Sequence, residues 1–515
     1  MKKMMLQICS FLLAVTLLCS AAMAVGEVYV NDAGSKISGD FSEVYAVGSA
    51  GTQQIGSATA TAMTAAGLKK VGDTSQDYDP VPVDLKTVRV GLFYGSTTRG
   101  EVSLTLTNGN AFRVGYFDEN RNFVELARVS GNGVTVAPDQ TAKIDAGQLG
   151  GYHIRLNQTY ASMDEAQKAA NAMGGFPFYS NGEYAVLIGS YTSKDDAEAA
   201  LKKNGWSGSA YKATDRSVLL LKGGTLQVLF GFDCGSSYSL AVSPVSDGKA
   251  VTKCGSYSYY GDFQFTRLTG DDLTVVNFIG LEDYTKGVLA NEMASDWPLE
   301  ALKAQAVLAR TYAVANQNKF RAYGFDLSND TNSQVYRGLN ETTDKTNQAV
   351  DETAGQFVRY QGAVCAVYYF AADGGATEDS ENVWSDTVVP YLRGIKDPYE
   401  ADIDFYCKSW SITVPKSQTG EITTTKTPIG NIQSLTADGK TYNKDNVRSF
   451  LKSIGARYTS RHFTVTESGS NYVITGGGYG HNLGMSQWGA YSMAKEHNMT
   501  YDQIISFYFT GAYVG

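Results

Sequence analysis

Residues 281–313 read LEDYTKGVLANEMASDWPLEALKAQAVLARTYA, and they form the first strongly helical stretch of the chain. Apolar residues recur at a helical period from Leu281 to Met293, which predicts one helix over that range. The run from Ser295 to Pro298 then supplies a cap residue and a proline suited to a first helical turn. A second, alanine-rich helix is predicted from Leu299 to Ala313, and its small side chains allow close helix packing.

Three charged residues interrupt this buried pattern. Glu292 closes the first predicted helix among apolar neighbours, and Lys303 and Arg310 share one face of the second helix. A partly desolvated carboxyl group beside cations is the arrangement from which a general acid is built. A structural salt bridge that ties the two helices together fits the same residues, and the pattern alone favours it.

The amino terminus has the parts of a secretory signal peptide. Two lysines precede an apolar run from Ile8 to Leu18, and the segment ends in Ala22-Met23-Ala24. We expect cleavage after Ala24, which removes residues 1–24 and leaves a protein that is secreted or held in the cell envelope, outside the cytoplasmic membrane. An uncleaved segment that anchors the chain is the alternative, although the run is short against the roughly 20 residues that span a bilayer.

The composition describes a long, acidic chain with few charges. Its 515 residues exceed what one hydrophobic core usually organises, so several domains are expected. Charged residues make up only 18%, which excludes a charge-rich disordered chain. The net charge is −9, or −11 once two lysines leave with the signal peptide, and this argues against nucleic acid as a partner.

Six cysteines are present, and Cys9 and Cys19 lie in the signal peptide. An even number in an exported chain indicates disulfides, with three possible pairings among the remaining four. The local pairings Cys234–Cys254 and Cys365–Cys407 are favoured, and free thiols are the alternative.

Three segments precede the helical stretch. Residues 25–85 are rich in small residues and predict a loosely structured lead-in and linker, and residues 86–147 alternate apolar and polar residues, which predicts a small β-rich unit. In residues 149–223 the order is β-α-β-β-α-β, with capped helices at Ser162–Met173 and Ser193–Lys203 and a closing strand at Val218–Leu221. This order predicts a ferredoxin-like module.

Residues 149–223 also resemble the SPOR domain, a peptidoglycan-binding module. The matching residues are Gly189-Ser190-Tyr191-Thr192-Ser193 followed by Asp196 to Leu201, with a weaker half-repeat from Ala161 to Ala166. The resemblance implies binding of bare glycan. Any other small α+β module is the alternative.

The stretch from Leu281 to Tyr312 resembles the signature of the SpoIID/LytB family of sporulation and cell-wall proteins. Its pattern is LE-x-Y, then G-V, E-M, P-x-E-A-L-K-A-Q-A and A-R-T-Y-A. Further segments match the family in order, and they are Phe325–Leu327 with Ser333–Gly338, Gly374–Thr377 with Val383-Trp384 and Pro390–Leu392, and Gly476–Ala490. The resemblance covers residues 224–515, which it predicts to form a mixed α/β catalytic region.

This resemblance implies a lytic transglycosylase that cuts peptidoglycan glycan strands, preferring strands stripped of stem peptides, to leave 1,6-anhydro-muramyl ends. Such an enzyme needs one carboxylic acid, and Glu292 matches the catalytic acid of the family. Lys303 and Arg310 match cationic positions near that acid. The other candidates for substrate binding are Thr377, Tyr391, His481, Ser486 and Gln487, and a structural role for His481 in ordering the glycine-rich loop is an equal alternative.

No cofactor is expected. Some family members hold zinc with His and Cys near the Gly-Gly-x-Thr segment, but here Tyr368 to Gly375 contains neither residue type. We therefore predict no metal ligands.

The sequence thus predicts an α+β, multidomain protein with a peptidoglycan-cleaving activity, acting in sporulation or in cell-wall remodelling. A non-enzymatic protein that binds peptidoglycan and enhances a cell-wall amidase is the alternative function, which would make that amidase a partner. A structural surface protein fits the excess of tyrosine and glycine but leaves the long motifs unexplained.

Overall fold

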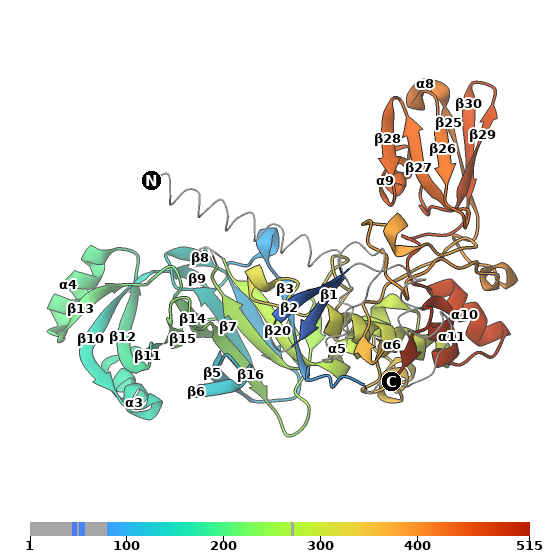
Figure 1. Cartoon of the computed structure of the whole chain (residues 1–515). Helices are drawn as coiled ribbons and strands as arrows, with labels where there is room; N and C mark the ends of the chain where they lie inside the picture. The colour runs from blue at the N-terminus through green and yellow to red at the C-terminus, as the bar shows by residue number, and fades with distance from the viewer. Residues whose placement is uncertain (1–43, 49–50, 57–79, 269–271) are drawn as a thin grey trace. The chain divides into compact units, whose positions relative to one another are not determined.

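The computed structural model describes residues 44–48, 51–56, 80–268 and 272–515, with the elements labelled in Figure 1. The predicted signal peptide lies outside the described residues. Two compact units divide the chain, one built from residues 85–291 and 316–342 and the other from residues 292–315 and 343–515 together with the segment before Leu85. Across the described ranges, no helix has both the length and the apolar character needed to cross a bilayer.

The predicted lead-in contains one described hairpin. Strands β1 (Val44–Gly48) and β2 (Gly51–Gly56) pair antiparallel. The segment was predicted to be loosely structured, and this hairpin is an element that its composition did not indicate.

The unit of residues 85–291 and 316–342 is built on two large sheets. The ten-stranded sheet has the order β13 (Gly208–Lys212), β10 (Tyr152–Tyr160), β12 (Glu183–Tyr191), β11 (Gly175–Ser180), β15 (Val228–Phe232), β14 (Val218–Lys222), β7 (Gly133–Pro138), β4 (Val102–Leu106), β17 (Thr252–Cys254) and β18 (Tyr257–Tyr259). The seven-stranded sheet has the order β21 (Leu327–Ser328), β3 (Thr87–Phe93), β20 (Thr274–Gly280), β19 (Asp262–Thr266), β16 (Leu240–Val245), β5 (Ala111–Phe117) and β6 (Phe123–Ser130).

The strands expected within residues 86–147 are present, but they do not form a sheet of their own. β4 and β7 join the ten-stranded sheet, while β3, β5 and β6 join the seven-stranded sheet. Strands from residues 218–280 complete both sheets, so hydrogen-bonded ladders cross the predicted boundaries at residues 147 and 223. The remaining elements here are a hairpin of β8 (Ala142–Ile144) with β9 (Gly147–Leu149), and short 3-10 turns at Gly95–Thr97 and Arg321–Tyr323.

Both helices predicted for residues 149–223 are present with their caps. α3 (Met163–Met173) begins after Ser162, whose Oγ accepts a hydrogen bond from the Glu165 N–H, and Ser193 does the same for α4 (Lys194–Asn204). The fourth strand of this segment is β13, which pairs antiparallel with β10. The predicted closing strand at Val218–Leu221 is instead β14, paired with β15 and β7, so that part of the prediction was wrong. Periodicity identifies a strand but not its neighbour.

The sheet of this segment is buried on both faces. Val186 and Ile188 of β12 pack with the helices, in a core that includes Ala170 and Ala197. The alternate residues of β12, Ala185 and Leu187, pack with Phe176 and Phe178 into a second core that includes Leu149 and Leu219. Alternating side chains on a strand reach opposite faces, so both faces have lost most of their contact with water.

All four described cysteines are buried and free, which contradicts the predicted disulfides. Cys254 lies on β17 and Cys234 follows β15, and three strands separate β15 from β17 in the sheet. Four strand spacings amount to about 19 Å, whereas bonded cysteines have Cα atoms about 4.4–6.8 Å apart. Cys365 and Cys407 are separate thiols as well, and burial raises the pKa of Cys407 to about 12. Closeness in sequence was a poor guide to closeness in space.

The helices expected from residues 281–313 are confirmed. α5 runs from Leu281 to Glu292, and α6 runs from Leu299 to Ala315. α6 is buried on nearly every side, and its alanines at 301, 304, 306, 309 and 313 are fully buried. Such small side chains let neighbouring elements approach the helix closely, which explains its unusually apolar composition.

The unit that contains α6 has several further helices and short strands. They are α7 (Asp344–Asp351), β22 (Val358–Tyr360), β23 (Ala363–Val364), β24 (Tyr369–Phe370), β31 (Met485–Ser486), α10 (Gln487–Glu496), α11 (Tyr501–Tyr508) and β32 (Tyr513–Val514), with 3-10 turns at Ser380–Asn382 and Tyr399–Asp402. β22 pairs with β23 and β32, and β24 pairs in parallel with β31.

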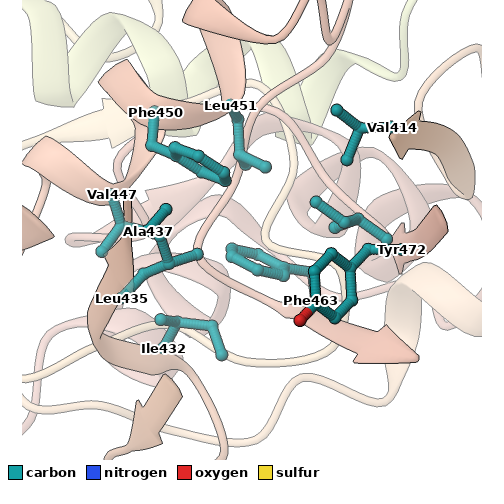
Figure 2. Packing of buried hydrophobic residues seen from close by; sticks show 10 residues of the cluster. Val414, Ile432, Leu435, Ala437, Val447, Phe450, Leu451, Phe463 and Tyr472 are labelled. Atoms are coloured by element: carbon teal, nitrogen blue, oxygen red, sulfur yellow. The ribbon is translucent and has the colours of Figure 1, made fainter. Parts of the chain in front are cut away.

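Residues 410–476 form a β-rich lobe, drawn in orange in Figure 1, with a core of its own. Its elements are β25 (Trp410–Pro415), α8 (Lys416–Thr419), β26 (Thr423–Lys426), β27 (Ile432–Ala437), β28 (Lys440–Asn443), α9 (Asn446–Ser453), β29 (Phe463–Ser468) and β30 (Asn471–Gly476). Figure 2 shows side chains of α9, β27 and the β29–β30 hairpin packed together, among them Phe450, Leu435 and Phe463.

Candidate functional site

Glu292, the predicted catalytic acid, is the last residue of α5 and is half-buried. Gln487 opens α10, and its side-chain Nε2 donates a hydrogen bond to the backbone oxygen of Glu292 at 3.3 Å. The fold thus brings together two sequence motifs that are almost 200 residues apart. Both residues were predicted site residues, and the structure places them in contact.

Gln305 is a neighbour that the sequence did not indicate. It lies on α6 and is fully buried, and its Oε1 is 3.4 Å from Nε2 of Gln487. Gln487, at the start of α10, therefore contacts both the last residue of α5 and the middle of α6. The alanine-rich run around Gln305 suggested only packing, because a buried glutamine cannot be told from an exposed one by periodicity.

The two predicted cations have other partners. Nζ of Lys303 lies 2.8 Å from Oε1 of Glu300 and 2.7 Å from Oε2 of Glu352. The guanidinium of Arg310 is fully buried and donates to the backbone oxygens of Val350 and Gln356 at 3.1 and 3.3 Å. Arg310 thereby satisfies carbonyls at and beyond the end of α7, where a helix leaves acceptors without partners.

Thr377 and Tyr391 are buried and bonded to the backbone. Oγ1 of Thr377 accepts from the N–H of Ile395 at 2.9 Å, and the hydroxyl of Tyr391 accepts from the N–H of Ala366 at 3.0 Å. Both were predicted to bind substrate, and in the structure their side chains are almost entirely enclosed.

The glycine-rich segment packs backbone against backbone. Gly374 and Gly478 have φ angles of +76° and +84°, and a Cβ on Gly374 would lie 2.3 Å from the oxygen of Gly477. Only glycine fits both the positive φ and this approach. Ser486, in the same motif, begins α10 and accepts a hydrogen bond from the Gly489 N–H. Its Oγ donates to Glu400 at 2.5 Å, so it is a buried cap and not an exposed donor.

His481 acts as a neutral, structural hydrogen-bonding group. Its Nδ1 accepts from the N–H of Leu483 at 3.1 Å, and its Nε2 lies 3.1 Å from the oxygen of Tyr369. Loss of hydration lowers the pKa of His481 to about 4. This geometry favours the structural alternative for this residue.

We expect His481 to make the protein less stable at mildly acidic pH. Its pKa is lower in the folded chain than the ordinary value of about 6.5, so the unfolded chain binds the proton first as pH falls. The free energy of unfolding should fall between about pH 6.5 and pH 4, by at most about 3 kcal/mol from this group. Urea unfolding across that range would show a shallower pH dependence in His481→Gln. The exposed His497→Gln serves as the control, and equal slopes in all three proteins would contradict the prediction.

Three buried carboxyl groups, Asp373, Asp397 and Glu400, form an acid cluster that the sequence analysis missed. One oxygen from each lies within 4.8 Å of the others. Burial, with help from the Asp397 charge, raises the pKa of Glu400 to about 7, and burial and the neighbouring acids raise the pKa of Asp373 well above its usual range. Asp373 directly precedes the Gly374–Thr377 segment, whereas Glu400 lies outside the matching segments, and their spacing of 27 residues gave no sign that they meet.

The acid cluster is the one group of potential metal ligands found among the described residues. Family resemblance implies zinc in some members. Zinc sites in proteins are built mainly from Cys sulfur and His nitrogen, so an all-carboxylate set does not fit that metal.

An aromatic strip begins next to Gln487. It consists of Trp297, Phe405, Tyr406, Tyr458, Tyr479, Trp488 and Tyr491. Ring centroids are 4.6 Å apart between Trp297 and Trp488, and 5.3 Å apart between Tyr406 and Tyr458. Tyr458 in turn lies 5.8 Å from Tyr479. Tyr406 and Tyr479 are 55% and 38% exposed, so the strip offers aromatic rings to solvent.

The fold and the site define a multidomain α+β protein in which the backbone of a half-buried glutamate contacts the glutamine that opens α10. Residues 269–360 match the family model described as SpoIID, stage II sporulation protein. The stage II sporulation protein D of Bacillus subtilis is 30% identical over 266 residues, which cover 46% of this chain and 75% of the relative. The chain therefore belongs to the stage II sporulation protein D family.

Two further relatives extend this comparison. An uncharacterized protein of Brachyspira hyodysenteriae is 38% identical over 268 residues, covering 49% of this chain and 71% of the relative. A Bacillus subtilis protein named amidase enhancer is 33% identical over 286 residues, covering 44% of this chain and 39% of the relative. The family assignment predicted from the motifs is thus confirmed.

Proposed function

We propose that the chain is a lytic transglycosylase of the cell envelope that cuts peptidoglycan glycan strands, with Glu292 as its acid. The observation that carries the proposal is the position of Glu292, half-buried at the end of α5 and tied through its backbone to Gln487. General acid catalysis requires a carboxyl group that is placed within reach of the leaving oxygen. A protonated carboxyl group is what such a reaction requires.

The proposed reaction needs one carboxyl group. Glu292 donates its proton to the glycosidic oxygen as the bond from the sugar C1 to that oxygen breaks. The 6-hydroxyl oxygen of the same sugar then bonds to C1, and its proton returns to Glu292. The product has a 1,6-anhydro end, and no water or second carboxylate takes part, in contrast to a two-carboxylate hydrolase.

The aromatic strip supports a carbohydrate substrate. Aromatic rings combine a large apolar face with, in Tyr and Trp, a polar edge, and this suits the faces of uncharged sugars. Because Trp488 directly follows Gln487, the strip leads away from the contact with Glu292. We place a bound glycan along it.

The test is the identity of the products. Purified protein is incubated with glycan strands stripped of stem peptides, and the fragments are analysed by mass spectrometry. A transglycosylase gives fragments that lack one water relative to hydrolysis products. Hydrolysed ends, or no fragments at all, would reject the proposed reaction.

The second candidate is enhancement of a cell-wall amidase, which the name of one relative favours. In that case the purified protein would bind sacculi without releasing fragments and would speed stem-peptide removal by an added amidase. An unchanged amidase rate in the presence of the protein would reject this candidate.

We propose that residues 149–223 are a SPOR-like module that binds bare glycan. Support comes from the strand order β13-β10-β12-β11, which is the order of a split βαβ unit. Because both faces of this sheet are covered, glycan contacts would fall on its rim, along the edge strand β13.

Hydrogen exchange on the full chain tests both binding surfaces. With denuded glycan present, backbone amides of β13 and of the aromatic strip should exchange more slowly than in the free protein. Strands that carry stem peptides serve as the control and should protect β13 less. Protection confined to the strip would reject the module, and protection confined to β13 would reject the strip.

A further inference from the structure

The acid cluster joins two segments of one unit. Asp373 follows β24, while Asp397 and Glu400 lie at the 3-10 turn of residues 399–402. The three residues are 0%, 4% and 4% exposed, and one oxygen of each lies within 4.8 Å of the others.

Within the described part of the chain, these carboxyl groups form no ion pair with a lysine, arginine or histidine. The side chains of Asp373 and Asp397 contact each other, and the partners outside the cluster are uncharged. Glu400 accepts from the N–H groups of Asp373 and Gly374 at 2.8 and 2.9 Å and from Oγ of Ser486. Asp397 accepts from the N–H of Tyr399 at 2.8 Å and from the hydroxyl of Tyr508 at 2.5 Å. Burying carboxylates without a counter-charge is costly, and either protonation or a bound cation offsets that cost.

Asp373 supplies a second, independent observation. Its Oδ1 accepts from the N–H of Gly375 at 2.6 Å, but its Oδ2 has no hydrogen-bond donor among the described residues and is fully buried. An acceptor that is enclosed, unbonded and placed within the cluster is an open ligand position.

We propose that Asp373, Asp397 and Glu400 bind one Ca²⁺ ion. Oxygens that bind one Ca²⁺ ion at about 2.4 Å lie no more than about 4.8 Å apart, and one oxygen of each residue is within that limit. Carboxylate oxygens suit hard cations, and the lack of Cys and His ligands excludes a typical zinc site. Mg²⁺ usually retains several waters, and a buried site disfavours this, so Ca²⁺ is the ion of choice.

The ion would join the elements that carry Ser486 and Tyr508. Ser486 bonds to Glu400 and begins α10, and Tyr508 bonds to Asp397 from α11. Since Gln487 follows Ser486 and contacts the backbone of Glu292, the ion would stiffen the support of that residue. The binding proposal itself does not depend on the proposed catalytic reaction.

Equilibrium dialysis of the full chain tests the site. The protein is treated with a chelator, freed of it, and dialysed against CaCl₂ or MgCl₂ in buffered NaCl, and bound metal is measured by mass spectrometry. We expect one Ca²⁺ per chain, with Mg²⁺ bound at least tenfold more weakly, and a melting midpoint that rises with Ca²⁺ until it saturates. A folded chain that binds no stoichiometric Ca²⁺ overturns the proposal, and equal binding of Mg²⁺ overturns the choice of ion.

Two variants assign the binding to these residues. Asp397→Asn keeps the shape of the side chain and should weaken Ca²⁺ binding at least tenfold, while raising the melting midpoint in chelator because one uncompensated charge is gone. Glu400→Gln should behave in the same way if the first variant folds poorly. The control is Asp404→Asn, which changes an exposed acid nearby and should bind Ca²⁺ as the unmodified chain does. Undiminished binding in either cluster variant would place the ion elsewhere and overturn the assignment.

Discussion

Glu292→Gln should lower the rate of release of anhydro-ended fragments from denuded glycan by about 10²- to 10⁴-fold, the usual contribution of a general acid. The amide has nearly the same shape as the carboxyl group but has no proton to give to the leaving oxygen. The backbone oxygen of Glu292 that contacts Gln487 is retained, so the fold should be unaffected. Fragments counted by mass spectrometry over time give the two rates.

The matched control is Glu282→Gln, because Glu282 lies in the first turn of the same helix. It should leave the rate within about twofold of the unmodified protein, since it makes no proposed contact with substrate. Equal rates for the unmodified protein and Glu292→Gln would remove Glu292 from the mechanism. A loss in both variants would indicate damage to α5 and not a missing acid.

Arg310→Met should cost about 2–5 kcal/mol of unfolding free energy, since each buried carbonyl left without a donor costs about 1–3 kcal/mol. Its guanidinium is fully enclosed and bonds to the carbonyls of Val350 and Gln356, and methionine would leave them without that donor. Urea unfolding measures the change.

Lys303→Met, on the same helix, is the comparison for Arg310→Met, and it should lower the free energy of unfolding much less. Lys303 is paired with Glu300 and Glu352, which are 30% and 42% exposed, so water can replace its contacts. Loss of such pairs typically costs no more than about 1 kcal/mol. If the two variants were equally stable, the structural role assigned to Arg310 would be wrong.

Local signals predicted the helices well. The period from Leu281, the Pro298 turn and the serine caps each depend on neighbours within a few residues, and α3, α4, α5 and α6 all follow them. Glu292 and Gln487, which contact each other in the structure, both lie in sequence motifs. Only the resemblance of these motifs to a family suggested that the two residues belong to one site.

Signals that depend on distant partners were less reliable. Val218–Leu221 was correctly predicted as a strand but assigned to the wrong neighbours, and the four cysteines were paired by closeness in sequence. Thr377 and Tyr391 were expected to bind substrate, yet their hydroxyls accept hydrogen bonds from buried backbone. In each case the residue type indicated a kind of element or interaction, but the sequence did not indicate which distant residue would be its partner.

The sequence by itself determined the family, the helix pair that ends at Glu292, and the caps and glycines that fix local conformation, because these depend on side chains and dihedral angles within a turn or two. Only the tertiary structure decided which charges are solvated and which are buried. It paired Lys303 with acids, enclosed Arg310, and brought Asp373 together with Asp397 and Glu400 from a second segment. Burial and electrostatic interaction depend on distance in space, and the chain order of these residues does not contain it.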